Sequence, residues 1–237
     1  VALLADPVFR RALWNTFWFA IIANLLVVVL ATGLSSVLLA DFKGKWFIRF
    51  LVLLPWVAPI SLATITWLWT LDSIFSPIDW VLRQVGLLQD NMYWLGQPRL
   101  AMGSVIAVHT WRLVPLAAVI MMAGLIAIPS EINDAVAVDG AGPFRKLFQV
   151  TVPLMAPIIA VAVLFGVVLT ISDMTVVFVL TRGGPTNATQ VLASWAFFKG
   201  IEGGALAQGA AVALFLFPVL VAITAIILRV ARRTEVM

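Results

Sequence analysis

The stretch VPLMAPIIAVAVLFGVVLTISDMTVVFVLT, residues 152–181, decides the fold class of this chain. Its only ionisable side chain is Asp173, and a helix of about 20 consecutive apolar residues is long enough to cross the hydrocarbon core of a bilayer. Apolar residues follow one another without the alternation expected of a lipid-facing barrel strand. The stretch therefore predicts a membrane-spanning α-helix.

Four other stretches have the same character, at residues 14–40, 50–71, 100–128 and 203–228. Only the span at 100–128 carries ionisable side chains, His109 and Arg112. The whole chain is 63% hydrophobic and 11% charged, against about 25% charged residues in soluble domains. We therefore predict an all-α membrane protein, a polytopic helical bundle that forms one domain over residues 1–237. A soluble enzyme is excluded.

Several kinds of chemistry are also excluded. The chain has no cysteine and a single histidine, so it offers no disulfide, thiolate or multi-histidine metal site. It lacks the Gly-x4-Gly-Lys-Ser/Thr loop that cradles nucleotide phosphates. Its 15 basic residues are scattered and form no stripe for nucleic acid. We expect a non-catalytic chain that binds no metal or cofactor itself and has lipid around it.

Basic residues near the spans predict the orientation, because cytoplasmic loops are enriched in Lys and Arg. Segments 41–49, 129–151 and 229–237 hold eight of them, whereas the longer segments 1–13, 72–99 and 182–202 hold six. This bias predicts a cytoplasmic C-terminus. Arg10 and Arg11 then lie on the unfavoured side, and the chain begins with Val1. We expect that an earlier span precedes residue 1 and is missing from this sequence.

The loop 129–151 reads as two short helices separated by a turn at Gly140 or Gly142. Ser130 is the expected N-cap, and the acidic residues Glu131 and Asp134 favour the positive end of the first helix. One face of that helix is apolar: Ile132, Ala135 and Val136. A helix of about ten residues needs packing to persist in water. Two interpretations remain open, a docking element for a partner protein and an amphipathic connector on the membrane surface.

Two motifs resemble one known family. Asp134-Ala135-Val136, then residues 137–139, Gly140, Phe148 and the pair Pro153 and Pro157 are similar to the Glu-Ala-Ala loop of inner-membrane permease subunits of binding-protein-dependent ABC importers. The stretch from Leu180 to Thr189 resembles the Leu-Thr-x-Gly-Gly-Pro turn of the sugar-type branch, which includes the maltose permeases. Asp and Val replace Glu and Ala in the first motif, while Asp139-Gly140-Ala141 matches it.

The resemblance implies a type I permease fold in a bacterial inner membrane, with this chain forming half of a translocation pathway. The implied partners are a second homologous permease, two copies of a cytoplasmic ATPase that bind ATP and Mg, and an extracytoplasmic sugar-binding protein. Family members usually have six core spans, which again indicates a missing first helix. The loop 129–151 would couple to the ATPase through Glu131, Ile132, Asp134, Ala135, Val136, Asp139, Gly140, Phe144 and Arg145.

Polar and aromatic residues inside the spans are the candidate substrate contacts, because a sugar needs hydrogen-bond partners and aromatic faces. The candidates are Thr170, Ser172, Asp173, Arg112, His109, Asn24 and Trp111. Arg112 and Asp173 either form an ion pair or act independently along the pathway. His109, one helical turn from Arg112, is either a hydrogen-bonded residue or a proton relay.

Overall similarity to the family favours a disaccharide such as trehalose or maltose as the substrate. An alternative is a proton-coupled secondary transporter, which would show an internal repeat and broken helices; neither is evident in the sequence. A second alternative is an ABC permease for a non-sugar solute such as glycerol phosphate, which would require more cationic groups in the pathway than Arg112 alone.

Overall fold

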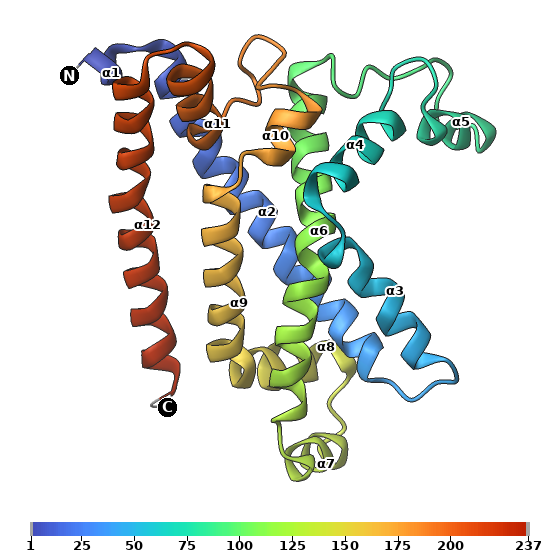
Figure 1. Ribbon diagram of the computed structural model, residues 1–237. Helices are drawn as coiled ribbons and strands as arrows, with labels where there is room; N and C mark the ends of the chain where they lie inside the picture. Colours follow the sequence, from blue (N-terminus) through green and yellow to red (C-terminus); the bar gives the residue numbers. More distant parts are fainter. Residues whose placement is uncertain (1, 236–237) are drawn as a thin grey trace.

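The computed structural model describes residues 2–235, a bundle of helices with no strand in that range (Figure 1). The α-helices are α1 (Ala2–Ala5), α2 (Pro7–Leu39), α3 (Lys45–Val57), α4 (Ile60–Thr70), α5 (Pro77–Gln84), α6 (Pro98–Ile126), α7 (Ser130–Val138), α8 (Pro143–Lys146), α9 (Val152–Ser172), α10 (Thr175–Leu180), α11 (Leu192–Phe197) and α12 (Leu206–Glu235). Two π-helical turns, Leu147–Thr151 and Phe198–Glu202, precede α9 and follow α11.

Five segments between residues 2 and 235 are long and apolar enough to cross a membrane. Four are single helices or continuous helical stretches: α2, α6, residues 143–172 and residues 206–229. The fifth is the pair α3 and α4, which meet at an angle of 95°. Each segment overlaps one of the stretches that the hydropathy pattern predicts, although the segment 143–172 begins and ends before the predicted stretch 152–181 and the α3 and α4 pair is bent.

The span predicted at 50–71 is interrupted at Ala58 and Pro59. Ala58 has an extended backbone, with φ −63° and ψ 141°, and Pro59 precedes the first residue of α4. A proline ring clashes with a helical conformation of the residue before it and supplies no N–H for the helix. The helix therefore stops at Val57 and restarts in a new direction, so our expectation of one continuous helix was wrong here.

The span predicted at 152–181 is also broken, at Asp173. This residue adopts φ −86° and ψ 126°, and its Oδ1 accepts a hydrogen bond of 2.8 Å from the backbone N–H of Thr175. A short acidic side chain that bonds to the backbone in this way competes with the helix and favours a cap or turn. The helix therefore ends at Ser172, and α10 begins three residues later, at Thr175. Broken helices are thus present in this chain, although its sequence did not reveal them.

The core lies where α2 crosses α6 and α9 near the middle of the bundle (Figure 1). Toward the end of the bundle that carries α5, α4 and α10 pack together beside a cluster of buried apolar residues around Val105 and Val177. A second cluster of buried apolar residues lies along the same crossing and includes Val27 of α2, Leu113 of α6 and Met155 of α9. α12 packs on α9 and α11 at the edge of the bundle. α6 is thus surrounded by other helices along most of its length.

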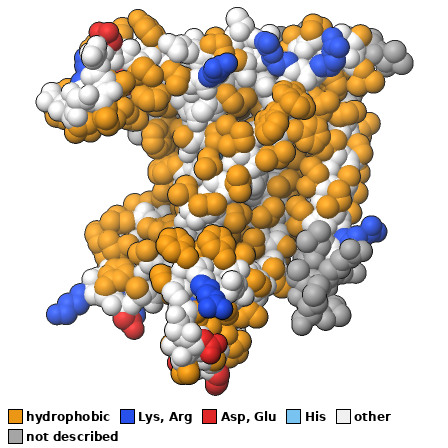
Figure 2. Space-filling model, turned by 180° about the vertical axis from the view of Figure 1, so that it is seen from behind, with side chains coloured by type: hydrophobic (Ala, Val, Ile, Leu, Met, Phe, Trp, Pro, Cys, Tyr) orange, Lys and Arg blue, Asp and Glu red, His pale blue; other side chains and the backbone are white. Residues whose placement is uncertain are grey.

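The molecular surface is banded as a membrane protein requires. Figure 2 shows apolar side chains over the middle of the molecule, with Lys, Arg, Asp and Glu gathered toward its two ends. The turn at residues 40–44, helices α7 and α8 and the end of α12 lie at one end, whereas α1, α5 and the turn after α10 lie at the other (Figure 1). This grouping matches the predicted sides, and the cytoplasmic location of the first group stays a prediction.

Candidate functional site

Arg112 and Asp173 lie together at the centre of the bundle. Nη1 of Arg112 is 3.4 Å from Oδ2 of Asp173, and the two side chains are 19% and 14% exposed. The choice left open by the sequence is therefore resolved in favour of a pair in this structure. Because Oδ1 of Asp173 caps α10 through Thr175, the same carboxylate fixes the break in the span and balances the charge of the guanidinium.

The guanidinium of Arg112 also contacts the other broken span. It lies over the ring of Trp56, 5.3 Å from the ring centroid, a separation at which a cation is attracted to an aromatic face. Trp56 is two residues before the extended Ala58, so one side chain on α6 contacts residues beside both breaks. Close by, Trp111 and Trp67 meet edge to face with centroids 5.4 Å apart. Charge and aromatic faces are thus combined at one level of the bundle.

Beside this pair, His109, Thr170 and Asn24 form an enclosed cluster at the crossing of α6, α9 and α2, with exposed fractions of 0%, 1% and 6%. Thr170 Oγ1 is 2.9 Å from His109 Nε2 and 3.3 Å from Asn24 Nδ2, and it donates to the carbonyl of Gly166 at 2.6 Å. Asn24 Nδ2 also donates to the carbonyl of Ala20 at 2.8 Å. These three candidates therefore hold the helices together in this conformation, whereas Ser172 is exposed.

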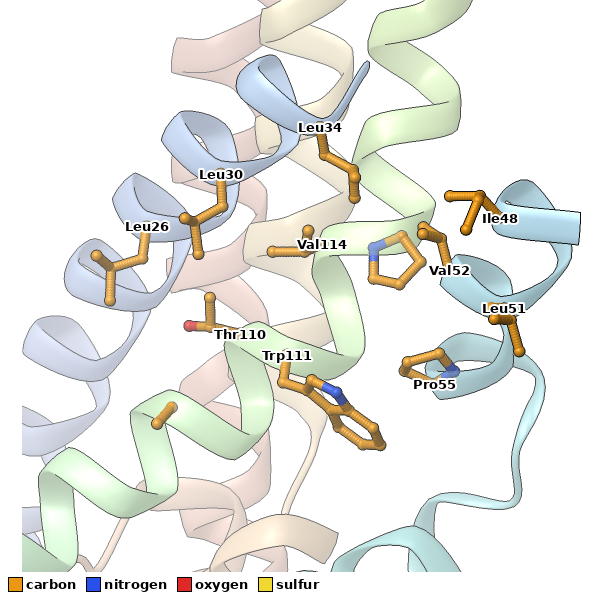
Figure 3. Close-up of a pocket in the computed structure, with 12 residues that line it drawn as sticks. Leu26, Leu30, Leu34, Ile48, Leu51, Val52, Pro55, Thr110, Trp111 and Val114 are labelled. Carbon is orange, nitrogen blue, oxygen red and sulfur yellow. The ribbon is translucent and has the colours of Figure 1, made fainter. Parts of the chain in front are cut away.

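An open groove of about 790 Å³ lies beside this centre, between α2, α3 and α6 (Figure 3). The groove is lined mainly by aliphatic side chains, among them Leu30, Leu51 and Val114, and the ring of Trp111 projects into it from α6 (Figure 3). Thr110 is the one lining residue with a side-chain hydroxyl. A polyhydroxylated solute needs several hydrogen-bond partners, so the groove alone does not satisfy a sugar. Arg112, which follows Trp111 in α6, and its partner Asp173 are not among the residues that line the groove.

The loop 129–151 contains one separate short helix, α7; the predicted second short helix was wrong, because α8 continues through the π-helical turn Leu147–Thr151 into α9. Gly140 adopts φ +64° between α7 and α8, a conformation that glycine reaches without a steric penalty. The predicted N-cap was wrong: Pro129 occupies the cap position, and Ser130 is already the first helical residue. The extended backbone of Pro129, with ψ 143°, starts the helix without a side-chain cap. Glu131 stands in the first turn, as expected.

The apolar face of this loop differs from the one expected. Val136 is buried against this chain itself, whereas Val138 is 88% exposed and Phe144 and Phe148 are 77% and 65% exposed. Among the other predicted coupling residues, the exposed ones are Glu131, Asp134, Ala135, Asp139, Gly140 and Arg145, and Ile132 is partly buried. The surface available to a partner is thus built on Val138, Phe144 and Phe148, and helical spacing alone did not identify Val138.

At the opposite end, the Gly-Gly-Pro turn is held by α2. Asn15 Nδ2 donates to the carbonyls of Ala188 and Gln190 at 3.0 and 2.9 Å, and Arg11 donates to the carbonyl of Thr186 at 2.8 Å. Gly183 has φ +84°, and the amide oxygen of Gln190 occupies the space that a side chain at Gly183 would fill. The turn therefore has a single shape that depends on residues more than 170 positions earlier in the chain.

Residues 12–236 match the family model described as binding-protein-dependent transport system inner membrane component. The chain belongs to this family. A sulfoquinovosyl glycerol transport system permease protein from Agrobacterium fabrum is 30% identical over 99% of this chain and 75% of its own length. A trehalose/maltose transport system permease protein from Thermococcus litoralis is 28% identical over 92% of this chain and 72% of its own length.

Solved structures of bacterial ABC transporters share this fold. A bacterial ABC transporter that imports the acidic polysaccharide alginate superposes with a TM-score of 0.84 over 98% of this chain and 82% of its own, at 20% identity. The all-α permease fold expected from the resemblance is thereby confirmed, and so is the membership in a family of inner-membrane transport components. The break after α9 and the bend between α3 and α4 therefore occur within a permease fold.

Proposed function

We propose that this permease forms half of the pathway of an ATP-driven sugar importer, with solute passing between it and a second homologous permease. The observation that carries the proposal is the family match over residues 12–236. The Arg112 and Asp173 pair, next to Trp56 and Trp111, is its polar contact point. An extracytoplasmic binding protein delivers the solute at the end that carries α5 and the Gly-Gly-Pro turn.

The charges at this point favour an uncharged solute. A phosphate-bearing solute requires cationic groups that are not already neutralised, and Arg112 faces the Asp173 carboxylate at 3.4 Å. A sugar hydroxyl both donates and accepts, so it suits an ion pair whose two partners offer one acceptor and one donor. Relatives whose names specify trehalose, maltose or diacetylchitobiose support a carbohydrate. We expect a disaccharide, with trehalose and maltose the first to test.

The energy comes from outside this chain. Two copies of a cytoplasmic ATPase hold ATP and Mg. One of them docks on the surface of this chain formed by Val138, Phe144 and Phe148, and the other docks on the second permease. A partner groove that covers these side chains removes apolar area from water, at about 25 cal/mol for each Å². α7 then acts as a lever between the ATPase and the two spans that flank it in the chain, α6 and the helical stretch that begins at Pro143.

Purification from the native membrane tests this proposal. The permease is isolated in mild detergent with whatever assembles on it, and ATP hydrolysis is measured with trehalose, maltose and a wider sugar panel in the presence of the captured binding protein. Co-purification of an ATPase and a second permease, with hydrolysis stimulated by one sugar, is the expected result. A lone protein whose uptake follows a proton gradient would overturn the proposal and restore the secondary-transporter alternative.

A substitution separates docking from folding. Val138→Asp places a charge in the proposed docking surface and should abolish association with the ATPase, while leaving the amount of inserted permease unchanged. Leu87→Asp is the matched control, because Leu87 is an aliphatic residue of similar exposure, 72%, at the opposite end. Retained ATPase association in Val138→Asp, or equal loss in both variants, would remove the coupling role from α7.

A further inference from the structure

The buried imidazole of His109 has two different neighbours. Its Nε2 is 2.9 Å from Thr170 Oγ1, and its Nδ1 is 3.9 Å from Oδ2 of Asp173. The side chain is fully enclosed, with 0% exposure. Nδ1 has no hydrogen-bond partner among the residues that the structure describes. His109 therefore stands between the enclosed cluster and the Arg112 and Asp173 pair.

Counting the hydrogens of Thr170 fixes the proton on His109. A threonine hydroxyl has one hydrogen and two lone pairs. That hydrogen goes to the carbonyl of Gly166 at 2.6 Å, and Asn24 Nδ2, which has only hydrogens to offer, takes one lone pair at 3.3 Å. The remaining lone pair must accept from His109, so Nε2 carries a hydrogen. In a neutral imidazole the other nitrogen, Nδ1, is then a bare acceptor.

A bare Nδ1 facing a carboxylate is a pair of acceptors with no hydrogen between them. Their separation of 3.9 Å is too long for a direct hydrogen bond, yet one oxygen atom at about 2.8 Å reaches both. The group that satisfies two acceptors at once must donate two hydrogens from one atom, as a water molecule does. A sugar hydroxyl has a single hydrogen and serves only one of them. A water also needs two or more polar partners when it is buried.

We propose that His109 is held as the Nε2–H tautomer and that its Nδ1, together with Asp173 Oδ2, binds a water molecule that donates to both. One oxygen of the Asp173 carboxylate is then fixed by Thr175 and the other by Arg112 and the water. His109 is thus a positioning residue for the carboxylate that contacts the solute. The tautomer and the water stand independently, and only the effect on transport rests on the proposed function.

The single histidine of this chain makes the tautomer directly measurable. Permease labelled with ¹⁵N-histidine and reconstituted in lipid gives the NMR spectrum of one imidazole. We expect Nδ1 to show the signal of an unprotonated ring nitrogen, Nε2 that of a protonated one, and a magnetisation transfer from water to Nδ1. A protonated Nδ1, in either the other tautomer or the imidazolium form, would overturn the proposal, and so would the absence of transfer from water.

Two amide replacements separate the two sides of the ring, because the polar atoms of Asn lie near the position of Nδ1 and those of Gln near Nε2. His109→Asn keeps an acceptor toward Asp173 and loses the bond to Thr170, whereas His109→Gln does the reverse. In the complete importer with its binding protein, uptake of radiolabelled trehalose or maltose is measured for both. We expect the half-saturation concentration to rise about tenfold in His109→Gln and less than threefold in His109→Asn, with similar maximal rates.

Equal effects of the two variants, or a larger effect in His109→Asn, would mean that His109 serves only the enclosed cluster and would overturn the positioning role. Asp173→Asn gives a check that needs no transport, because its amide still accepts from Thr175 but presents a changed group to the water. The Nδ1 signal should shift in this variant, and an unchanged signal contradicts the shared water. If the wild-type importer moves no sugar, the proposed function fails while the NMR result still decides the water site.

Discussion

Adding one methyl group at Gly166 should destabilise the crossing of α2 and α9. A side-chain carbon built on Gly166 overlaps Asn24 Oδ1 and lies 3.3 Å from Asn24 Cγ. Asn24 is buried and bonded to Ala20 and Thr170, so its side chain cannot turn away without breaking those hydrogen bonds. Gly166→Ala therefore forces the helices apart or breaks those hydrogen bonds.

The cost follows from two terms. Overpacking a well-filled core costs about 1–3 kcal/mol, and each hydrogen bond between helices in a membrane contributes about 0.6 kcal/mol on average. Alanine in place of glycine returns up to about 1 kcal/mol through its higher helix propensity. The net loss is about 1–3 kcal/mol, which corresponds to about 2–12 °C in the midpoint of thermal unfolding for a chain of this size. Loss of monodisperse protein on heating in detergent measures it.

Two further variants make the reasoning refutable. Gly103→Ala is the control, because Gly103 is also helical and a side-chain carbon there meets nothing within 4 Å; its midpoint should be unchanged or higher. Asn24→Ala removes the obstructing atom, so Gly166→Ala should cost much less when combined with it. If Gly166→Ala and Gly103→Ala behave alike, or if the effects of Gly166→Ala and Asn24→Ala simply add, the packing explanation is wrong.

Three other predictions concern charges and turns. Arg112→Ala leaves a mostly buried carboxylate unpaired, which costs toward the lower end of about 3–5 kcal/mol, and pairing it with Asp173→Ala should recover most of the loss of thermal midpoint. The backbone N–H groups of Phe75 and Ile74 lower the pKa of Asp72 below its ordinary 3.8. This turn is therefore stabilised above pH 3.8 and loosens as the pH falls through the lowered pKa. Faster hydrogen exchange of those two backbone amides at acid pH, which should be absent in Asp72→Asn, measures the effect. Gly183→Ala should sharply reduce the yield of folded protein, since φ +84° and the neighbouring amide of Gln190 both oppose a side chain, and size-exclusion chromatography reports it.

The overall architecture was predictable because hydropathy acts over whole spans. The stretches around residues 14–40, 100–128 and 203–228 have no strong competitor to a helix in lipid, and each forms one. The breaks were not predictable in the same way. A single proline leaves the outcome undecided, since Pro55 and Pro115 lie inside helices whereas Pro59 separates two. The presence of a proline therefore does not by itself predict where a span is interrupted.

Some residues of the candidate site were likewise predictable from the sequence and others were not. Ionisable residues inside spans are rare enough that Arg112 and Asp173 were identified from the sequence as candidates for pairing, and the structure brings them together. The spacing of apolar residues on a helix of nine residues does not show which side faces the rest of the chain. We therefore expected Val136 to contact a partner protein, whereas it is buried within this chain. The role of Asn15 depends on a turn about 170 residues away, a relation that no local pattern contains.

Arg112 touches Asp173 on one broken span and Trp56 on the other, and this double contact sets a thermodynamic condition on the permease. Coupling between two equilibria is reciprocal: if solute binding at Asp173 weakens the Arg112 and Trp56 contact by some factor, weakening that contact must change the affinity for solute by the same factor. A substitution at Trp56 is therefore expected to alter the equilibrium affinity for the solute, even though its ring contacts the guanidinium of Arg112 and not the carboxylate. The bend between α3 and α4 is in this sense a second reporter of the binding site.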